Sequence, residues 1–258
     1  MKHLKVATFN TNSIRARLPI ITDWLDNAQP DVLFIQETKV QDKDFPRSPF
    51  EEKGYNVLFK GQKSYNGVAT FSKAPFDDTR LSLYDGGDED ARFLSATIEG
   101  VTMINVYVPQ GFAVGSEKFE YKQRWLKDFL SYIKNNFDSS DPLLLAGDFN
   151  VALEPIDVYD PEKLQGEVGF HPDEQAILRE FLAWGFVDIF RKHEPEGNHY
   201  TFWDYRIPNG FKRNLGWRID YILATKPLAD KSQRAWVDTE PRTRQKPSDH
   251  TFLVAEFF

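Results

Sequence analysis

The sequence predicts an α/β fold, with residues 1–258 forming one large domain. Short apolar runs of strand length alternate with segments of helical periodicity, and a long amphipathic helix leads into a buried strand as in an α/β crossover. No linker, low-complexity segment or short-period repeat divides the chain. With 41% hydrophobic and 15% aromatic residues, the chain can bury a large core.

The first part of the chain predicts two strands and a helix. Residues 2–9 predict a strand followed by Asn10, and residues 32–35 predict a buried strand followed by Glu37. Between them, apolar positions at residues 19–25 have helical spacing. Both strands therefore present polar side chains at their carboxyl ends, although a solvated residue at a strand end would also explain Glu37.

The middle of the chain predicts a strand, a hairpin and a helix. Residues 66–71 form the strand, and residues 92–98 and 101–108 form the hairpin, with its turn at Glu99–Gly100. Residues 117–137 carry apolar side chains at the spacing of a long amphipathic helix. The second hairpin strand contains Tyr107 near its end, where packing is the ordinary role of a tyrosine.

The apolar run at residues 143–146 predicts a strand buried on both faces. If the extended conformation continues past Gly147, the side chains of Asp148 and Asn150 point to the same side. An ordinary turn is the alternative explanation, because Gly, Asp and Asn are common turn residues. The rest of the chain predicts a loop over residues 151–169, a helix over 171–184, and strands over 217–224 and 251–257.

Composition excludes several classes of site. The chain has no cysteine, so disulfides, thiolate metal sites and cysteine nucleophiles are excluded, and any metal must be held by oxygen or imidazole. No apolar stretch is long enough for a membrane helix, and the start of the chain does not have the pattern of a signal peptide. We therefore expect a soluble, cytoplasmic protein that does not bind membranes.

The charge is unevenly distributed. The formal net charge is −7, which argues against a partner bound by charge alone. However, residues 205–250 contain ten Lys or Arg against five Asp or Glu, so this segment is basic and the remainder is more acidic. A local basic face on an acidic protein is consistent with nucleic-acid binding.

Polar residues follow one predicted strand after another, and in one sheet they would converge on one edge. Carboxylates gathered there repel one another unless a cation lies between them, and oxygen ligands without sulfur suit Mg²⁺ or Mn²⁺. Glu37 and Asp249 are the candidate ligands. Hydrolysis of a phosphodiester also needs donors to the phosphoryl oxygens and an oriented water. His250 and Tyr107 are candidate donors, and Asp148 is a candidate to orient or deprotonate the water.

Asp220 is a polar residue in an otherwise apolar predicted strand. A buried carboxylate needs a partner, and we predict that Asp220 keeps His250 protonated. An ion pair with Arg218 is the alternative, but neighbouring residues on a strand point to opposite faces.

Ordered motifs along the chain make it similar to the exonuclease III family of apurinic/apyrimidinic endonucleases. The motifs are FNTNSIRAR at the start, QETK at residue 36, NGVATFSK at 66, YVPQG at 107, GDFNVA at 147, WGFVDIFR at 184, YTFWDYR at 200, GWRIDYILA at 216 and SDH at 248. A single short motif would not be specific, but this ordered set covers essentially the whole chain.

The resemblance implies a four-layer α/β sandwich of DNase I type, in which two packed sheets are flanked by helices. It implies that Glu37 binds the metal with Asn10 and Asp249 nearby, that Asp148 positions or activates water, and that Asn150 and His250 bind the scissile phosphate. It further implies that Tyr107 donates to that phosphate or assists the leaving group, and that Asp220 pairs with His250.

The resemblance also implies contacts with substrate. Phe202, Trp203 and Trp217 match the family's apolar pocket for a sugar without a base, although core packing is the alternative for each aromatic residue. Asn12, Arg15 and Gln110, within the matching motifs, are further candidate substrate contacts. Lys212 and Arg213 lie in the loop at residues 206–214, where members of the family differ in how they hold the duplex.

The resemblance implies a Mg²⁺-dependent phosphodiesterase that cuts double-stranded DNA 5′ to an abasic site and leaves 3′-hydroxyl and 5′-deoxyribose phosphate ends. The alternatives are a predominant 3′ to 5′ exonuclease, which would act at 3′ ends, a less specific DNase I-like nuclease, a small-molecule phosphatase and a damage-binding protein without turnover. We expect a monomer, without a separate N-terminal extension.

Overall fold

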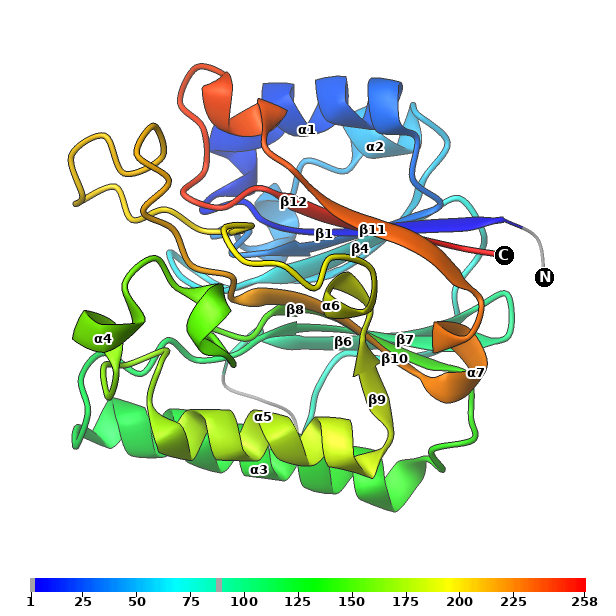
Figure 1. Cartoon of the computed structure of the whole chain (residues 1–258). Helices are drawn as coiled ribbons and strands as arrows, with labels where there is room; N and C mark the ends of the chain where they lie inside the picture. Colours follow the sequence, from blue (N-terminus) through cyan, green and yellow to red (C-terminus); the bar gives the residue numbers. More distant parts are fainter. Residues whose placement is uncertain (1–2, 87–89) are drawn as a thin grey trace.

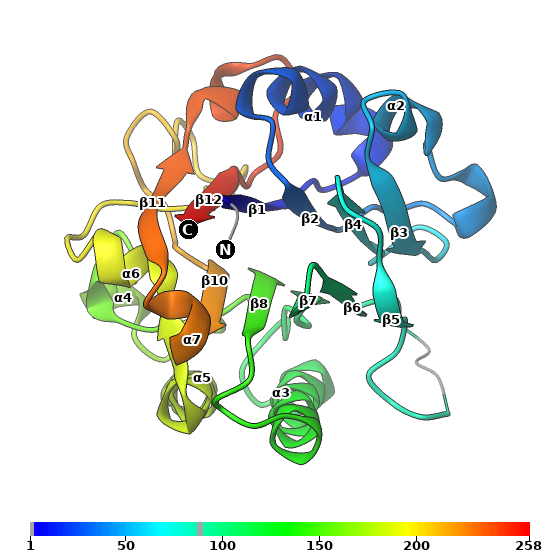
Figure 2. The ribbon, with the colours of Figure 1, turned by 90° about the vertical axis from the view of Figure 1, so that its right-hand side faces the viewer.

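The computed structural model describes residues 3–86 and 90–258, and its elements form four layers. Two six-stranded mixed sheets pack face to face in the middle, with α1 and α2 on the outer side of one sheet and α3 and α5 on the outer side of the other (Figure 1; Figure 2). This arrangement confirms the predicted α/β sandwich.

The first sheet has the strand order β11-β12-β1-β2-β4-β3. Its strands are β1 (Leu4–Asn10), β2 (Val32–Gln36), β3 (Asn56–Lys60), β4 (Val68–Ser72), β11 (Ser232–Asp238) and β12 (Phe252–Phe257). Because β1 runs parallel to β2 and antiparallel to β12, the ends of β1 and β2 lie beside the start of β12. The sheet therefore brings Asn10, Glu37 and His250 to the same edge.

The second sheet has the order β5-β6-β7-β8-β10-β9. Its strands are β5 (Asp77–Arg80), β6 (Phe93–Ile98), β7 (Val101–Tyr107), β8 (Leu143–Asp148), β9 (Phe186–Asp188) and β10 (Asp220–Thr225). Tyr107 pairs with Asp148 across the parallel β7 and β8, and Asp148 pairs with Asp220 across the antiparallel β8 and β10. Register alone thus places these three residues side by side.

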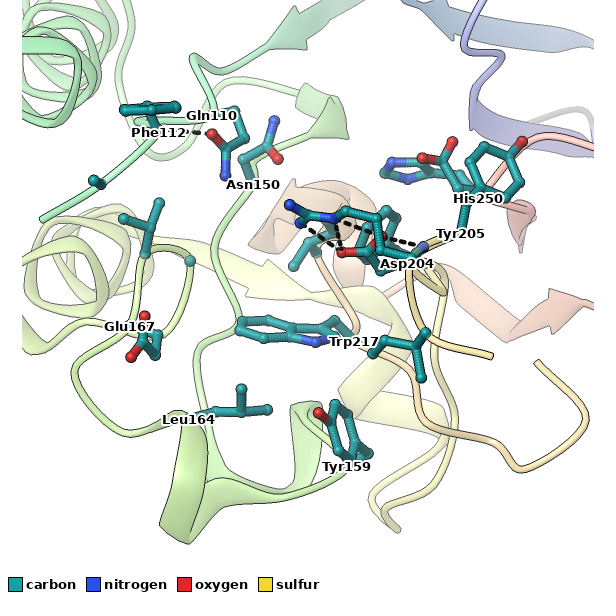
Figure 3. Close-up of a pocket in the computed structure, with 18 of the residues that line it drawn as sticks. Gln110, Phe112, Asn150, Tyr159, Leu164, Glu167, Asp204, Tyr205, Trp217 and His250 are labelled. Carbon is teal, nitrogen blue, oxygen red and sulfur yellow. Dashed lines mark hydrogen bonds and ion pairs between the residues drawn. The ribbon is translucent and has the colours of Figure 1, made fainter. Parts of the chain in front are cut away.

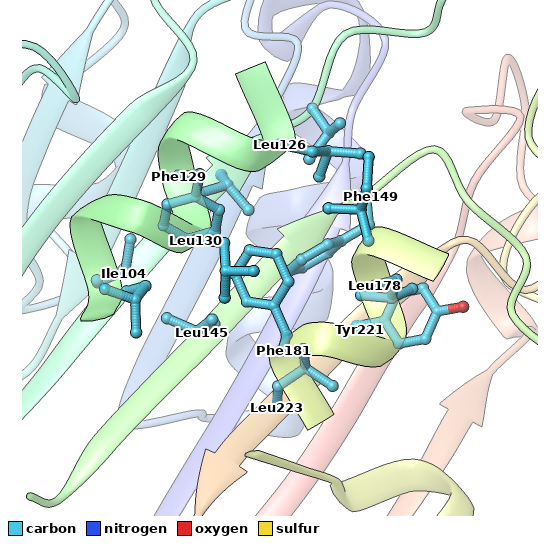
Figure 4. Packing of buried hydrophobic residues seen from close by; sticks show 14 of the residues in the cluster. Ile104, Leu126, Phe129, Leu130, Leu145, Phe149, Leu178, Phe181, Tyr221 and Leu223 are labelled. Carbon is cyan, nitrogen blue, oxygen red and sulfur yellow. The ribbon is translucent and has the colours of Figure 1, made fainter. Parts of the chain in front are cut away.

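The outer helices are amphipathic and bury their apolar faces on the sheets. Helices α1 (Ile14–Ala28) and α2 (Ser48–Glu51) cover the first sheet, and α3 (Glu117–Asn136) and α5 (Pro172–Trp184) cover the second. Ser116 caps α3 by accepting a hydrogen bond from the Phe119 amide. Phe129 of α3 and Phe181 of α5 interlock over β8 (Figure 4). This packing anchors the strand that ends in Asp148.

Shorter elements complete the chain. They are α4 (Pro161–Leu164), α6 (Ile189–His193), α7 (Lys226–Ala229) and the 3₁₀ turns η1 (Asp42–Asp44), η2 (Pro155–Asp157) and η3 (Glu240–Thr243). The helix predicted over residues 19–25 begins earlier, at Ile14, and includes Pro19. The first predicted strand begins at Lys2, which lies outside the described residues. Within residues 3–86 and 90–258, no helix has the length and apolar character needed to cross a membrane.

A buried polar network joins the two sheets. Gln36 of β2 donates from Nε2 to Asn105 Oδ1 of β7 at 2.7 Å, and Asn105 Nδ2 donates to the Ala69 carbonyl of β4 at 2.8 Å. Gln36 and Asn105 are both inaccessible to solvent. Gln36 precedes Glu37 and Asn105 lies two residues before Tyr107, so this network connects the sheets close to their functional edge.

Candidate active site

Both sheets end at one cavity of about 950 Å³. One part of its wall carries the polar residues Glu37, Tyr107, Asn150, Asp249 and His250, and another part carries aromatic and apolar side chains that include Phe202 and Trp217. In Figure 3 the Trp217 ring lies in the middle of the cavity, with Asn150 and His250 on one side and Tyr159 and Leu164 on the other.

Asp148 ends β8 behind the cavity wall and is almost completely buried. Gly147 precedes it with φ 145°, and a Cβ there would lie 2.0 Å from the Val106 carbonyl oxygen, so only glycine allows this close approach of the strands. Asp148 Oδ2 accepts hydrogen bonds from Asn10 Nδ2 at 2.8 Å and from Asn150 Nδ2 at 3.2 Å.

A tight turn after β8, and not a longer strand, places Asn150 next to Asp148. Its φ is 52°, and its backbone N–H donates to Asp148 Oδ1 at 2.8 Å. Its side-chain Nδ2 also donates to the Val108 carbonyl at 3.0 Å. The segment after β8 is therefore a turn, which was the alternative to a continued strand. This turn brings the Asp148 carboxylate and the Asn150 carboxamide together.

His250 lies between two carboxylates. Its Nδ1 is 2.8 Å from Asp220 Oδ2, and its Nε2 is 3.8 Å from Asp148 Oδ2. Burial opposes the charged imidazole, but the attraction of Asp220 and Asp148 outweighs it and raises the pKa of His250 to about 10. The imidazole is therefore positively charged at neutral pH, with Nε2–H directed away from Asp220.

Two groups near His250, Asp148 and Tyr107, have raised pKa values. Burial raises the pKa of Asp148 to about 7, with Asp220 adding to the shift and His250 opposing it. Burial and the nearby Glu37 and Asp148 carboxylates raise the pKa of Tyr107 well above its ordinary value, so its phenol remains a hydrogen-bond donor. The Arg92 guanidinium lies over the Tyr107 ring, 4.8 Å from its centroid.

A chain of hydrogen bonds links Glu37 to Asp249. Glu37 Oε1 accepts from Asn10 Nδ2 at 2.8 Å, and Glu37 Oε2 lies 2.8 Å from Lys39 Nζ. Lys39 also donates to Asn12 Oδ1, and Asn12 Nδ2 donates to Asp249 Oδ1 at 3.0 Å. Burial opposes ionisation of Glu37, but Lys39 and Asn10 hold its pKa below the ordinary value.

These residues fit a hard divalent cation. Glu37 and Asp249 both line the cavity, and the available ligand atoms are carboxylate and amide oxygens. The Lys39 ammonium, held by Glu37 and Asn12, shows that the position attracts positive charge. Asn10 is fully buried and orients both Glu37 and Asp148 through its amide.

A different group in the described part of the chain has ligand atoms at metal-ligand spacing. Ligand atoms of Asp148, Asp220 and His250 lie within 4.8 Å of one another, and all three residues are buried. In the structure these residues are already paired with one another and with Asn10 and Asn150.

The structure places only two of the three predicted aromatic residues at the cavity. Phe202 and Trp217 line the cavity, and the Phe202 ring lies 4.9 Å from the His250 ring. Trp203 does not line it: it is 2% exposed, packs edge-on against Phe211, and donates from Nε1 to Asn214 Oδ1 at 3.3 Å. The reason is that successive side chains of an extended segment point to opposite sides.

The other candidate substrate contacts lie at different places. Gln110 lines the cavity, whereas Arg15, Lys212 and Arg213 are exposed and outside its lining. Sequence reasoning missed several cavity residues, namely Tyr159, Lys163, Leu164, Tyr205 and Arg206. Arg206 pairs with Asp204. These residues come from segments without a strand-end pattern. Only the YTFWDYR motif and the loop at residues 206–214 pointed to any of them.

Comparison with known proteins identifies the family. Residues 7–250 match the model of the endonuclease/exonuclease/phosphatase family. The chain is 34% identical to exodeoxyribonuclease III of Haemophilus influenzae over 98% of this chain and the whole relative. An AP endonuclease structure from Archaeoglobus fulgidus is 45% identical, covers 98% of this chain and 99% of its own, and superposes with a TM-score of 0.95. A 3′ phosphatase from Neisseria, solved with a product DNA hairpin, is 36% identical, with 99% of each chain covered and a TM-score of 0.95. The chain belongs to the endonuclease/exonuclease/phosphatase family of hydrolases, in the group of exonuclease III and the AP endonucleases.

Proposed function

We propose that this protein is a Mg²⁺-dependent DNA repair phosphodiesterase that cuts double-stranded DNA 5′ to an abasic site, leaving 3′-hydroxyl and 5′-deoxyribose phosphate ends. One observation carries the proposal: His250, paired with the buried Asp148 and Asp220, lines a cavity with Phe202 and Trp217 in its wall. Hydrolytic groups and an apolar surface are thus adjacent. The name of the Archaeoglobus relative, an AP endonuclease, agrees with this assignment.

Glu37 and Asp249 would hold the cation, with Asn10 fixing the orientation of Glu37. When bound, Mg²⁺, or Mn²⁺ in its place, would neutralise charge on the phosphate during hydrolysis. We prefer this position to the group of Asp148, Asp220 and His250, because Nδ1 of His250 is already engaged with Asp220 and the imidazole carries a proton.

The residues of the chain have separate roles around the phosphate. His250 Nε2–H would donate to a phosphoryl oxygen, and Asp220 keeps the ring charged and oriented. Asp148, with a pKa of about 7, would orient the attacking water and accept its proton. Asn150 Nδ2 donates to the Val108 carbonyl and to Asp148 in the free protein, and it would redirect one of these N–H groups to the phosphate. The protonated Tyr107 would donate to the phosphate or the leaving oxygen.

The apolar wall favours a sugar without a base. A flipped deoxyribose that carries no base is small and has an apolar face, which Phe202 and Trp217 would contact. Predominant 3′ to 5′ exonuclease or 3′-phosphatase activity is the second candidate. The two Neisseria relatives, at 36% and 37% identity, are described as a 3′ phosphatase and a 3′-5′ exonuclease. Each of these reactions breaks a P–O bond on the 3′ side of a sugar, so one site would serve all three.

We also propose that the protein acts as a monomer inside the cell. One chain supplies both the polar and the aromatic wall of the cavity, so the proposed reaction does not require a second copy.

The test offers the protein two labelled duplexes, one with a single abasic-site analogue and one intact with a recessed 3′ end. Each is incubated with Mg²⁺ and then with EDTA. Nicking 5′ to the analogue, abolished by EDTA, is the expected result. Equal degradation of the intact duplex would favour the exonuclease, and activity undiminished by EDTA would overturn the metal assignment. His250→Ala is the matched inactive control.

A further inference from the structure

A lysine with no contact to the cavity is buried beneath it. Lys122 lies in the second turn of α3 and is inaccessible to solvent. Its ammonium forms an ion pair with Glu174, which is also inaccessible. Moving two charged groups from water into the protein interior costs free energy, and the attraction between them often does not offset this cost. The burial of Lys122 and Glu174 is therefore not explained by stability alone.

The ammonium of Lys122 makes two contacts besides the ion pair, and both go to the cavity wall. Nζ donates to the backbone carbonyl of Asn150 at 2.7 Å and to that of Gln110 at 3.2 Å. The three N–H groups of the ammonium thus have three acceptors. Asn150 and Gln110 lie side by side on the cavity wall (Figure 3).

Glu174 extends the same connection to a third segment. It occupies the first turn of α5, and its Oε2 accepts from the Gly169 amide at 2.8 Å and from the His171 amide at 3.3 Å. Gly169 lines the cavity and its carbonyl accepts from the Ala152 amide at 2.6 Å. One buried ion pair therefore holds the start of α5 against the turn that follows Asp148.

We propose that Lys122 and Glu174 are positioning residues, which fix the backbone of Gln110, Asn150 and Gly169 so that the Asn150 side chain meets the scissile phosphate in the correct geometry. The proposal rests on the proposed phosphodiesterase function. Neither residue touches substrate in this scheme. Displacement of a positioned group by about 1 Å can reduce turnover by about a hundredfold, so the effect should appear in kcat.

The first test compares Lys122→Met with the double variant Lys122→Met/Glu174→Met. The single variant leaves a buried carboxylate without its partner and should lose both stability and kcat. The double variant removes both charges and should regain much of the lost Tm. We expect its kcat to remain at least about tenfold below wild type with KM within about threefold, because the carbonyls of Asn150 and Gln110 still lack their donor.

A core variant on the same helix provides the control. Leu130→Ala removes apolar contacts of α3 away from the cavity and lowers Tm without touching these loops. Its kcat should stay near wild type. A kcat of the double variant that recovers together with Tm would overturn the proposal and leave the pair with a purely structural role, and so would an equal loss of kcat in Leu130→Ala. If Lys122→Met does not fold, Glu174→Gln replaces it as the test variant and should show a smaller loss of kcat. An unchanged kcat of Glu174→Gln would also overturn the proposal.

Hydrogen exchange gives a readout that does not depend on activity. Peptides containing residues 108–112, 149–153 and 167–171 should exchange at least about tenfold faster in the double variant, while residues 143–147 of β8 stay protected. Unchanged exchange in these loops would refute the positioning role. If wild type does not cut DNA, the proposed function fails, but the exchange result still reports on positioning.

Discussion

Nδ1 of His250 lies 2.8 Å from Asp220 Oδ2, and both side chains are buried at the meeting point of the two sheets. His250 lies two residues before β12 of the first sheet, whereas Asp220 begins β10 of the second. The pair therefore connects the two halves of the site and keeps the imidazole charged.

Asp220→Asn should reduce kcat by at least about tenfold, since the donor to the phosphate loses its orientation and part of its positive charge. The pKa of His250 is raised to about 10 by Asp220 and Asp148 against the effect of burial, so removing Asp220 lowers it. The loss should therefore be greater at pH 8.5 than at pH 6. Steady-state kinetics on the abasic duplex across this range measures it. An equal loss at both pH values would show that Asp220 acts only through geometry.

Asp148→Asn should reduce kcat by at least about a hundredfold, because the amide cannot accept the proton of the attacking water. Binding of the abasic duplex should be retained, since the amide has nearly the same shape and can still accept hydrogen bonds from Asn10 and Asn150. Single-turnover kinetics and fluorescence anisotropy separate the two effects. Loss of binding instead of turnover would mean that Asp148 holds the substrate.

Glu37→Gln should increase the Mg²⁺ concentration required for half-maximal activity by about tenfold or more, because one anionic ligand is lost. Titration of activity with Mg²⁺ measures the change. Glu52→Gln, at an exposed acid that directly follows α2, is the control and should leave the titration unaltered. If Glu37→Gln left it unaltered too, the cation would have to bind elsewhere, and the group of Asp148, Asp220 and His250 would be next to test.

Trp217→Ala and Trp203→Ala should have different consequences. Trp217 lines the cavity, so its loss should reduce the preference for abasic over intact duplex by about tenfold or more with the fold intact. Trp203 is buried outside the cavity lining, so its loss should mainly destabilise the protein, by about 3–5 kcal/mol. Competition between the two duplexes and urea unfolding distinguish the outcomes. A selective loss of abasic preference in Trp203→Ala would contradict the placement of that ring.

Asp157→Asn should reduce stability, and the reduction should be smaller in acid than at neutral pH. Asp157 is inaccessible and bonds to Arg218 Nε at 2.7 Å, with Arg191 also paired to it. Burial opposes its charge, but the two arginines hold its pKa below the ordinary value. Its stabilisation is thus present above about pH 4 and is lost as pH falls through the lowered pKa. We expect a cost of about 3–5 kcal/mol at pH 7. Urea unfolding from pH 7 to pH 3 tests this, and a difference that stays constant would exclude the charge as its cause.

The sequence predicted the inner strands and missed the outer ones. The four strands that no pattern indicated, β3, β5, β9 and β11, are the four edges of the two sheets. Inner strands such as β2 and β8 are buried on both faces, so their sequences are runs of apolar residues. Edge strands need fewer apolar residues, and β5 consists of Asp-Asp-Thr-Arg.

The site was predictable where strand ends carry chemistry and less so elsewhere. Asn10, Glu37, Tyr107 and Asp148 follow from strands whose register places them at one edge. The orientation of Trp203 did not follow from its motif, since two neighbouring aromatics cannot both face one cavity from an extended segment. Lys122 did not stand out either, because a lysine on an amphipathic helix ordinarily faces solvent.

The hydrogen bonds of Gln36 and Asn105 have a consequence for how the two sheets are aligned. Apolar side chains between packed layers tolerate small sliding movements, but a buried amide loses its partner when it is displaced by a fraction of a bond length. The hydrogen bonds therefore hold the two sheets in one alignment. They do so next to the functional edge, because Gln36 precedes Glu37 and Asn105 lies two residues before Tyr107. Shear between the halves of the molecule is thus suppressed at the place where a small displacement would separate the groups that act on the phosphate.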